Sequence, residues 1–282
     1  MKHDIEQYYE TVLGITREAG KIIKEGIART KNVDTKLGSW DLVTQYDRRV
    51  EKVLVAEISK KFPSHKFIAE ETNSEQKTTP ELTSAPTWVI DPIDGTTNFV
   101  HGFHLTCISI ALSIEKEVVI GIVYNPILEQ MFTAIKGRGA YLNNKRIYTS
   151  KVEELCQSMV CLESSFACIP SLRDSIMKRT EACIKVAHGI RVLGSAALAL
   201  CYVAMGVAEA YHIDGLQCWD VAAGALIVRE AGGVVLDSTG GIFDMMSHRI
   251  LACGTKTLAE ELVMLFKKAD ASLITNNNIN HI

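Results

Sequence analysis

The stretch of the chain that most constrains its fold runs from Thr87 to Gly102 and reads TWVIDPIDGTTNFVHG. Its first apolar residues, Trp88–Ile90, are β-prone and predict a buried strand. Pro92 favours extended geometry in the residue before it, so we expect this strand to end at Asp91. The glycine and the two threonines that follow predict a turn and a helix start near the carboxyl end of the strand.

A strand, a tight turn and a helix start would bring together three kinds of group that act on a phosphate ester. Asp91 and Asp94 would offer oxygen ligands to hard cations. Unpaired backbone N–H groups at the helix start would suit a phosphate. The hydroxyls of Thr96 and Thr97 would orient a water molecule. The stretch therefore predicts a metal-assisted phosphatase, although Asp, Gly and Pro are also ordinary residues of solvated loops.

A second acidic pair follows another predicted strand. Lys66–Ala69 is a short apolar run that leads into Glu70 and Glu71. Because side chains alternate along a strand, we expect these two acids to point in opposite directions and only one of them to face Asp91. The alternative is a solvated acidic strand end.

Two more acids lie near predicted helix starts. Asp47 is close to the beginning of an amphipathic helix that Pro63 ends, and Asp220 begins a helix of small residues that ends near Gly232 and Gly233. An acid at a helix start often serves as a cap or stabilises the helix dipole. Both carboxylates therefore have a structural interpretation beside a role in a site.

The hydrophobic pattern changes along the chain. Residues 4–28 predict a long amphipathic helix, and residues 105–135 predict an antiparallel meander of strands. From Met159 onward, short strands alternate with helices, the last of them over 258–266. A helical and antiparallel half followed by an alternating half predicts a layered α/β (α+β) fold with the site between the two halves.

The length of 282 residues allows one large domain or two fused halves. We expect a single domain over residues 1–282. The approximate halves are 1–150, which is α+β with an antiparallel sheet, and 151–270, which is α/β. Residues 271–282 are rich in asparagine and predict a flexible tail.

Composition excludes several classes of partner. The net charge of −3 gives no basic footprint for nucleic acid or an anionic membrane. No apolar run is long enough to predict a membrane span, and the N-terminus does not resemble a signal peptide. The 8 cysteines are scattered without zinc-binding spacing, which is typical of buried thiols in a reducing compartment. We therefore expect a cytoplasmic protein.

Taken together, these motifs resemble the inositol monophosphatase family, within the superfamily of lithium-sensitive, magnesium-dependent phosphatases. The resemblance covers roughly residues 4–268. It rests on residues 88–102, Glu70–Glu71, CWDVAAGALIVREAGG at 218–233, Asp41–Thr44 with Asp47, and His188–Arg191 before Gly194–Ala196.

The resemblance implies two or three Mg²⁺ ions in each site. Glu70, Asp91 and the carbonyl of Ile93 match ligands of the first ion. Asp91, Asp94 and Asp220 match ligands of the second, so that Asp91 bridges the pair. A third, weaker ion is associated with Glu70 largely through water.

The resemblance also implies catalytic and substrate-binding roles. A water oriented by Glu70 and Thr96 would attack the phosphorus in line, without a covalent phosphoenzyme, and Asp47 would pair with Thr96 to help position this water. The backbone of Gly95 and Thr96 would cradle the phosphate. The residues that would contact the alcohol part of the substrate are Asp94, Gly194, Ser195, Ala196 and Asp220.

For the whole protein, the resemblance implies an αβαβα sandwich of the sugar-phosphatase type, a homodimer, lithium inhibition, and roles in inositol biosynthesis and phosphatidylinositol signalling. One position departs from the family pattern. Family members commonly have a glutamate that binds inositol hydroxyls where this chain has Ile213. Either Asp214 replaces this glutamate with shifted geometry, or the contact is lost.

Three functions remain in competition. The first is magnesium-dependent hydrolysis of myo-inositol monophosphates to inositol and phosphate. The second is the same chemistry on another small phosphate ester, such as a sugar phosphate or a phosphoadenosine nucleotide, which Ile213 keeps open. The third is a non-catalytic binding protein. A binding role alone would not explain why all the acids named above are present.

Overall fold

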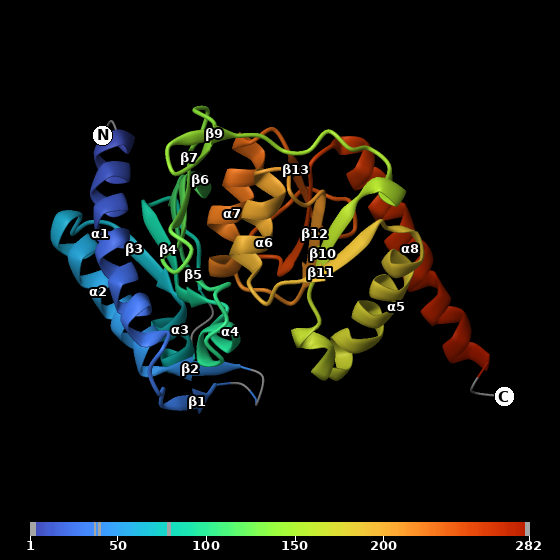
Figure 1. Ribbon diagram of the computed structural model, residues 1–282, viewed down its shortest axis with the longest axis horizontal. Coiled ribbons are helices and arrows are strands. Elements are labelled where there is room, and N and C mark those ends of the chain that lie inside the picture. Colours follow the sequence, from blue (N-terminus) through green and yellow to red (C-terminus); the bar gives the residue numbers. More distant parts are fainter. Residues whose placement is uncertain (1–3, 37, 39–40, 78–79, 280–282) are drawn as a thin grey trace.

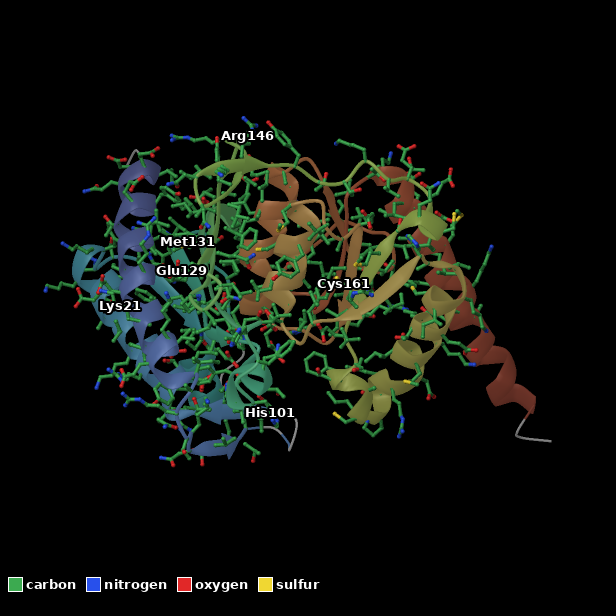
Figure 2. The ribbon with its side chains drawn as sticks, in the orientation of Figure 1. Lys21, His101, Glu129, Met131, Arg146 and Cys161 are labelled. Carbon is green, nitrogen blue, oxygen red and sulfur yellow. The ribbon has the colours of Figure 1, made fainter. Side chains whose placement is uncertain are left out.

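A computed structural model of the chain describes residues 4–36, 38, 41–77 and 80–279. Their helices and strands form five layers in the order helices, sheet, helices, sheet, helices (Figure 1). This arrangement is the αβαβα sandwich that the family resemblance implies. Side chains fill the space between the layers, as Figure 2 shows.

The first layer contains two amphipathic helices, α1 (Ile5–Gly26) and α2 (Gln45–Lys61), whose apolar faces pack on the first sheet. Between them, β1 (Val33–Thr35) and β2 (Leu42–Thr44) form a short antiparallel pair. The polar segment before Leu42 gave no strand pattern, so this hairpin was not predicted. β2 contacts α4, and α2 begins directly after β2.

The first sheet has seven strands in chain order, and only β3 and β4 pair in parallel. The predicted meander is confirmed as its antiparallel part. The strands are β3 (Lys66–Ala69), β4 (Thr87–Asp94), β5 (Cys107–Ile114), β6 (Glu117–Asn125), β7 (Gln130–Ile135), β8 (Ala140–Leu142) and β9 (Lys145–Ile147). Two short helices, α3 (Glu70–Gln76) and α4 (Thr96–Val100), follow the parallel strands.

The central layer is formed by α6 (Ala196–Ala204) and α7 (Cys218–Glu230), which are buried over most of their lengths. Their alanines and glycines allow close packing on both sheets. A Cβ atom on Gly121 of β6 would lie 2.7 Å from the carbonyl oxygen of Ala223. A Cβ atom on Gly224 would lie 2.6 Å from a side-chain carbon of Leu200 on α6. The small residues are therefore needed for this close packing. The packing of α7 on the first sheet in turn fixes the position of its N-terminus relative to β4.

The second sheet has the strand order β11-β10-β12-β14-β13, with β10 parallel to both of its neighbours. Helices α5 and α8 cover its outer face (Figure 1). The elements are β10 (Met159–Leu162), β11 (Gly189–Val192), β12 (Ala210–Asp214), β13 (Val234–Leu236), β14 (Arg249–Cys253), α5 (Pro170–Val186) and α8 (Lys256–Ile279), with 3₁₀ turns at Leu155–Gln157 and Ser165–Cys168.

The C-terminal helix is longer than the sequence pattern predicts. We expected it to end at Phe266, but α8 continues to Ile279 and takes in most of the segment expected to be a tail. Across the part of the chain that the structure describes, no helix combines the length and apolar character needed to cross a membrane.

Candidate active site

A β-bulge in β4 brings Asp91 and Asp94 to one side of the sheet. On a regular strand, residues three apart point to opposite faces. Here the pairing with β5 shifts between Asp91, which lies opposite Ser109, and Asp94, which lies opposite Cys107. One extra residue on β4 therefore turns Asp94 back toward Asp91. Pro92 lies inside this irregular stretch, where its missing N–H costs no regular ladder bond.

This bulge corrects one prediction. The strand was expected to end at Asp91 because of Pro92, but it continues to Asp94. The proline interrupts the register of the strand without ending it.

Asp220 joins the two aspartates from the first turn of α7. Its Oδ2 atom accepts a hydrogen bond from the backbone N–H of Gln217 at 2.7 Å, as a helix-capping carboxylate does. Asp91, Asp94 and Asp220 each offer a ligand atom to a group whose atoms all lie within 4.8 Å of one another. The capping role and the cluster role of Asp220 are therefore combined in one side chain.

The three carboxylates repel one another in a buried environment. Burial raises the pKa of Asp91 well above its usual range, and the charges of Glu70, Asp94 and Asp220 raise it further. Burial also raises the pKa of Asp220, with added repulsion from Asp94 and Glu70. A divalent cation prefers oxygen ligands and would relieve this repulsion. The donor set therefore fits a divalent metal ion.

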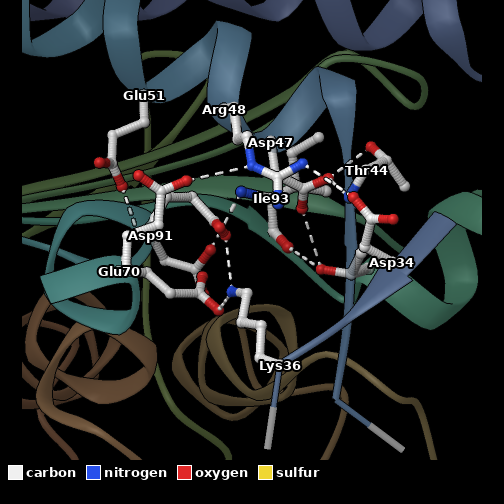
Figure 3. A network of polar contacts seen from close by, with 12 residues as sticks. Asp34, Lys36, Thr44, Asp47, Arg48, Glu51, Glu70, Asp91 and Ile93 are labelled. Atoms are coloured by element: carbon white, nitrogen blue, oxygen red, sulfur yellow. Dashed lines mark hydrogen bonds and ion pairs between the residues drawn. The ribbon is translucent and has the colours of Figure 1, made fainter. Parts of the chain in front are cut away.

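Glu70 and Glu71 are the first two residues of α3, and both face Lys36. The Nζ atom of Lys36 donates to Glu70 Oε1 and to Glu71 Oε1, each at 2.7 Å (Figure 3). The expectation that the two acids point in opposite directions is therefore wrong. Strand geometry ends at Ala69, and successive side chains of the helix that follows are not on opposite faces. The charge of Glu70 also acts on Asp91, so Glu70 lies at the edge of the cluster.

Sequence reasoning missed Lys36. Its side chain is only 10% exposed, and although burial alone would lower its pKa, the carboxylates of Glu70 and Glu71 outweigh burial and raise it. Lys36 belongs to a polar segment without a motif, so only the structure identifies it as the cation that faces these acids.

Asp47 and Thr96 are in contact where β4 leads into α4. Asp47 Oδ1 accepts a hydrogen bond from the hydroxyl of Thr96, and its Oδ2 atom accepts from the backbone N–H of Thr44 at 2.8 Å. The Thr96 hydroxyl also lies 3.0 Å from the carbonyl oxygen of Ile93. Asp47 caps α2, as its structural interpretation requires, and it contacts Thr96 as well. Burial raises the pKa of Asp47 to about 6, against the lowering effect of Thr44.

Gly95 allows α4 to begin close to the N-terminus of α6. Its φ angle is 84°, and a Cβ atom there would lie 2.9 Å from the carbonyl oxygen of Leu105 and 3.0 Å from that of Gly194. A residue other than glycine would force these segments apart. The first turn of α4 and the turn at Gly194 are therefore neighbours.

The turn before α6 is bound to Asp94. Ser195 donates its hydroxyl to Asp94 Oδ2, and the backbone N–H groups of Ala196 and Ala197 lie 3.3 and 3.0 Å from the carboxylate oxygens. The structure thus brings Gly194, Ser195 and Ala196 next to the acidic cluster.

Two residues that hold this turn were also missed. The Nδ2 atom of Asn98 lies 2.8 Å from the carbonyl oxygens of Leu105 and Leu193, so it joins α4 to the turn. Glu163 Oε1 accepts the backbone N–H of Gly194 at 3.0 Å. Asn98 lies inside the motif at residues 87–102, so its position in the sequence could have identified it as a site residue. Glu163 follows an ordinary strand and gives no such signal.

Ile213 and Asp214 lie on opposite faces of β12. Ile213 is buried among the residues that pack on α6 and α7. Asp214 instead accepts a hydrogen bond from Arg179 Nη1 at 2.9 Å, and Arg179 also binds Asp270 of α8. Asp214 is therefore bound on the face of β12 opposite the one on which Ile213 is buried.

Comparisons with known proteins agree over nearly the whole chain. The model of the inositol monophosphatase family matches residues 4–271. Inositol monophosphatase 2 of Rattus norvegicus is 42% identical over 256 residues, which cover 90% of this chain and 88% of the rat protein.

Solved structures with the same fold include the extragenic suppressor protein SuhB from Bartonella henselae, with a TM-score of 0.83 and 33% identity over 92% of this chain and 98% of that one. The inositol monophosphate-bound structure of SaIMPase-II has a TM-score of 0.78 and 26% identity, covering 96% of this chain and 99% of that chain. On the strength of the family match and the 42% identity to the rat protein, this chain belongs to the inositol monophosphatase family.

Proposed function

We propose that the protein is a phosphoric monoester hydrolase that converts myo-inositol monophosphates to inositol and phosphate with the help of Mg²⁺. The observation that carries this proposal is the buried cluster of Asp91, Asp94 and Asp220 beside the Asp47–Thr96 pair. The names of the relatives and the ligand in the SaIMPase-II structure support the choice of substrate.

The residues that would hold the metal ions are Asp91, Asp94, Asp220, Glu70 and the carbonyl group of Ile93. Two to three ions for each site is the number that we propose. When bound, divalent cations stabilise negative charge on the phosphate oxygens and the departing alkoxide, and they lower the pKa of water.

The chain's own residues would orient the attacking water and the phosphate. Thr96 is held between Asp47 and the Ile93 carbonyl, so its hydroxyl oxygen has a fixed position from which to bind water. Glu70 would bind the same water from the other side, as a general base. The backbone of Gly95 and Thr96 would bind the phosphate at the start of α4.

A covalent phosphoenzyme is not part of the proposal. Cys107 is a thiol in contact with the cluster, with Sγ 3.5 Å from Asp94 Oδ2. Burial, together with the charge of Asp94, raises the pKa of this thiol well above its ordinary value. Cys107 therefore stays protonated and is a poor nucleophile.

The alcohol part of the substrate would lie against Asp94, Asp220 and the turn formed by Gly194, Ser195 and Ala196. In this arrangement Asp94 would both bind a metal ion and hold the turn before α6, because Ser195 and the backbone of α6 donate hydrogen bonds to the same carboxylate. The side chain of Ile213 offers no acceptor for a substrate hydroxyl.

The proposal extends to the assembly and the setting of the protein. It includes a single domain, a homodimer, inhibition by Li⁺ at a Mg²⁺ site, and a cytoplasmic role in inositol recycling. All eight cysteines are free thiols, which is typical of a reducing compartment. Inhibition by tens of millimolar Li⁺ is the expected result in the assay below.

The test is phosphate release from inositol 1-phosphate with Mg²⁺ and with EDTA, beside fructose 1,6-bisphosphate and phosphoadenosine phosphate. A Mg²⁺-dependent preference for the inositol ester supports the proposal. Turnover of another ester alone would retain the metal chemistry and change the substrate, as Ile213 suggests. Absence of any turnover would favour a binding protein without catalytic activity.

A further inference from the structure

We propose that Glu51 is a positioning residue that fixes Glu70 by capping α3 from a neighbouring helix. The inference rests on the proposed metal site. Glu51 lies on α2 and is 4% exposed. Its Oε2 atom accepts the backbone N–H of Glu71 at 2.7 Å (the dashed line at Glu51 in Figure 3), and its Oε1 atom accepts the backbone N–H of Thr72 at 2.8 Å. The hydroxyl of Thr72 donates to the same Oε1 atom at 2.5 Å.

Helix α3 needs an external cap. The first N–H groups of a helix have no partner within the helix, and a Ser, Thr, Asp or Asn at the N-cap position usually supplies one. The N-cap residue of α3 is Ala69, which has no side-chain acceptor. The helix is also only 7 residues long, too short to be stable by itself. Glu51 supplies the missing acceptors from another part of the chain.

This cap acts directly on the element that carries Glu70. Glu70 and Glu71 are the first two residues of α3, so the backbone that Glu51 holds determines where the Glu70 side chain begins. From there the Glu70 carboxylate reaches both Lys36 and the vicinity of Asp91. A shift of the first turn of α3 would move this carboxylate relative to the cluster.

A single helix would thereby set the geometry of both sides of the site. Asp47 and Glu51 are one turn apart on α2 and so lie on the same face. Asp47 binds Thr96 at the end of β4, and Glu51 binds the first turn of α3 after β3. The spacing between the water-binding hydroxyl and the Glu70 carboxylate is therefore fixed by one rigid element.

The charge of Glu51 supports a specific role. Its carboxylate is buried and lies within the influence of the Glu70 charge, and both burial and that charge raise the pKa of Glu51, so a carboxylate at this place is electrostatically unfavourable. A side chain that only filled space would not need this charge. The hydrogen bonds that Glu71 and Thr72 donate offset the free-energy cost of burying this carboxylate. We therefore infer that the role of Glu51 lies in these hydrogen bonds.

The test compares Glu51→Gln with Glu57→Gln, which makes the same change at an exposed position of the same helix. The amide introduced by Glu51→Gln retains the volume of the carboxylate but presents a donor where two backbone donors require acceptors. Mg²⁺ affinity is measured by calorimetry without substrate, and folding is checked by thermal unfolding in EDTA. Glu51→Gln should weaken Mg²⁺ binding about tenfold, a typical effect for residues that support metal ligands. The control should match the wild type.

A rescue variant separates positioning from general stability. Ala69→Ser places a hydroxyl acceptor at the N-cap of α3, where it would bind the same N–H groups locally. Added to Glu51→Gln, it should restore most of the Mg²⁺ affinity. If Glu51→Gln is unfolded, Glu51→Asp provides the second variant: it retains the charge but is one methylene too short to reach both N–H groups, and it should weaken Mg²⁺ binding too.

A folded Glu51→Gln protein with wild-type Mg²⁺ affinity would overturn the inference, even if its melting temperature were lower. Its failure is distinguishable from failure of the proposed function, because Mg²⁺ binding is measured without turnover. A weakened Mg²⁺ affinity in a protein that hydrolyses no inositol ester would support the inference and contradict the proposed function.

Discussion

The hydroxyl of Thr96 donates a hydrogen bond to Oδ1 of Asp47 across 3.1 Å, although the two residues are 49 positions apart in the chain. The other carboxylate oxygen of Asp47 is bound by Thr44. Neither partner can therefore move without breaking a bond to a separate element. In the proposed mechanism, this rigidity is what gives the attacking water its direction.

The first prediction concerns this hydroxyl. Thr96→Val retains the shape of the side chain but cannot bind water or Asp47. We expect kcat for inositol 1-phosphate to fall about 10²–10⁴-fold, as for loss of a group that orients a reacting water, with a much smaller change in KM. Thr96→Ser retains the hydroxyl and is the control. Equal rates for the Val and Ser variants would contradict the proposed role.

The second prediction concerns Lys36. Lys36→Met leaves Glu70 and Glu71 without their nearest cation. In EDTA we expect the free energy of unfolding to fall by about 3 kcal/mol, because breaking a buried ion pair leaves uncompensated charge. Mg²⁺ should reduce this difference, since it supplies another positive charge beside Glu70.

Urea unfolding with and without Mg²⁺ measures both effects. The control is Lys52→Met, which removes an exposed lysine from α2. A loss of stability that is the same in EDTA and in Mg²⁺ would show that Lys36 and the metal ions do not neutralise the same carboxylates.

The third prediction concerns substrate preference. Ile213→Glu restores an acceptor on the face of β12 that points toward α6 and α7. A hydrogen bond to a substrate hydroxyl contributes about 0.5–1.5 kcal/mol, so KM for inositol 1-phosphate should fall by roughly two- to tenfold. Because Ile213 is 3% exposed, the variant should also be less stable. An unchanged KM in Ile213→Glu, with Ile213→Leu as the reference, would argue that this face does not contact the alcohol.

The fourth prediction is a pH dependence. Burial, opposed by the Gly194 N–H and aided by the charge of Asp94, raises the pKa of Glu163 from 4.5 to about 7. The native state therefore binds more protons than the unfolded state between these two values, and this group makes stability fall as pH rises through that window. At higher pH the cost reaches an upper limit of roughly 3 kcal/mol, from the difference of the two pKa values.

Glu163→Gln removes this titration. Its free energy of unfolding relative to the wild type should therefore be higher at about pH 8 than at about pH 5, as measured by urea unfolding in EDTA. A difference between the two proteins that does not change with pH would show that Glu163 titrates normally.

Much of the fold was predictable because hydrophobic periodicity records which face of each element is buried. The helices before Pro63 and the strands from Cys107 to Ile135 follow that pattern and were predicted. The β4 bulge was not, because Pro92 is equally compatible with a strand end. The length of α8 was missed because its last turns carry polar residues, which give no apolar stripe.

The site was predictable where a motif supplied it. Asp91, Asp94 and Asp220 lie within reach of one another, and Asp47 contacts Thr96, as the motifs imply. Lys36 and Glu51 were missed for a different reason. Each acts through a contact with α3 that depends on how distant elements pack, and an isolated lysine or a helical glutamate gives no signal of such a contact.

The measurement that tests the account most directly is phosphate release from inositol 1-phosphate by the wild type and by Asp91→Asn. Asp91 belongs to the acidic cluster, and asparagine retains its shape while removing its charge. We expect Mg²⁺-dependent turnover by the wild type, its loss in EDTA, and a decrease of about 10²–10³-fold or more in a folded Asp91→Asn protein. Wild-type rates in that variant, or turnover that persists in EDTA, would contradict a metal-dependent phosphatase built on this cluster.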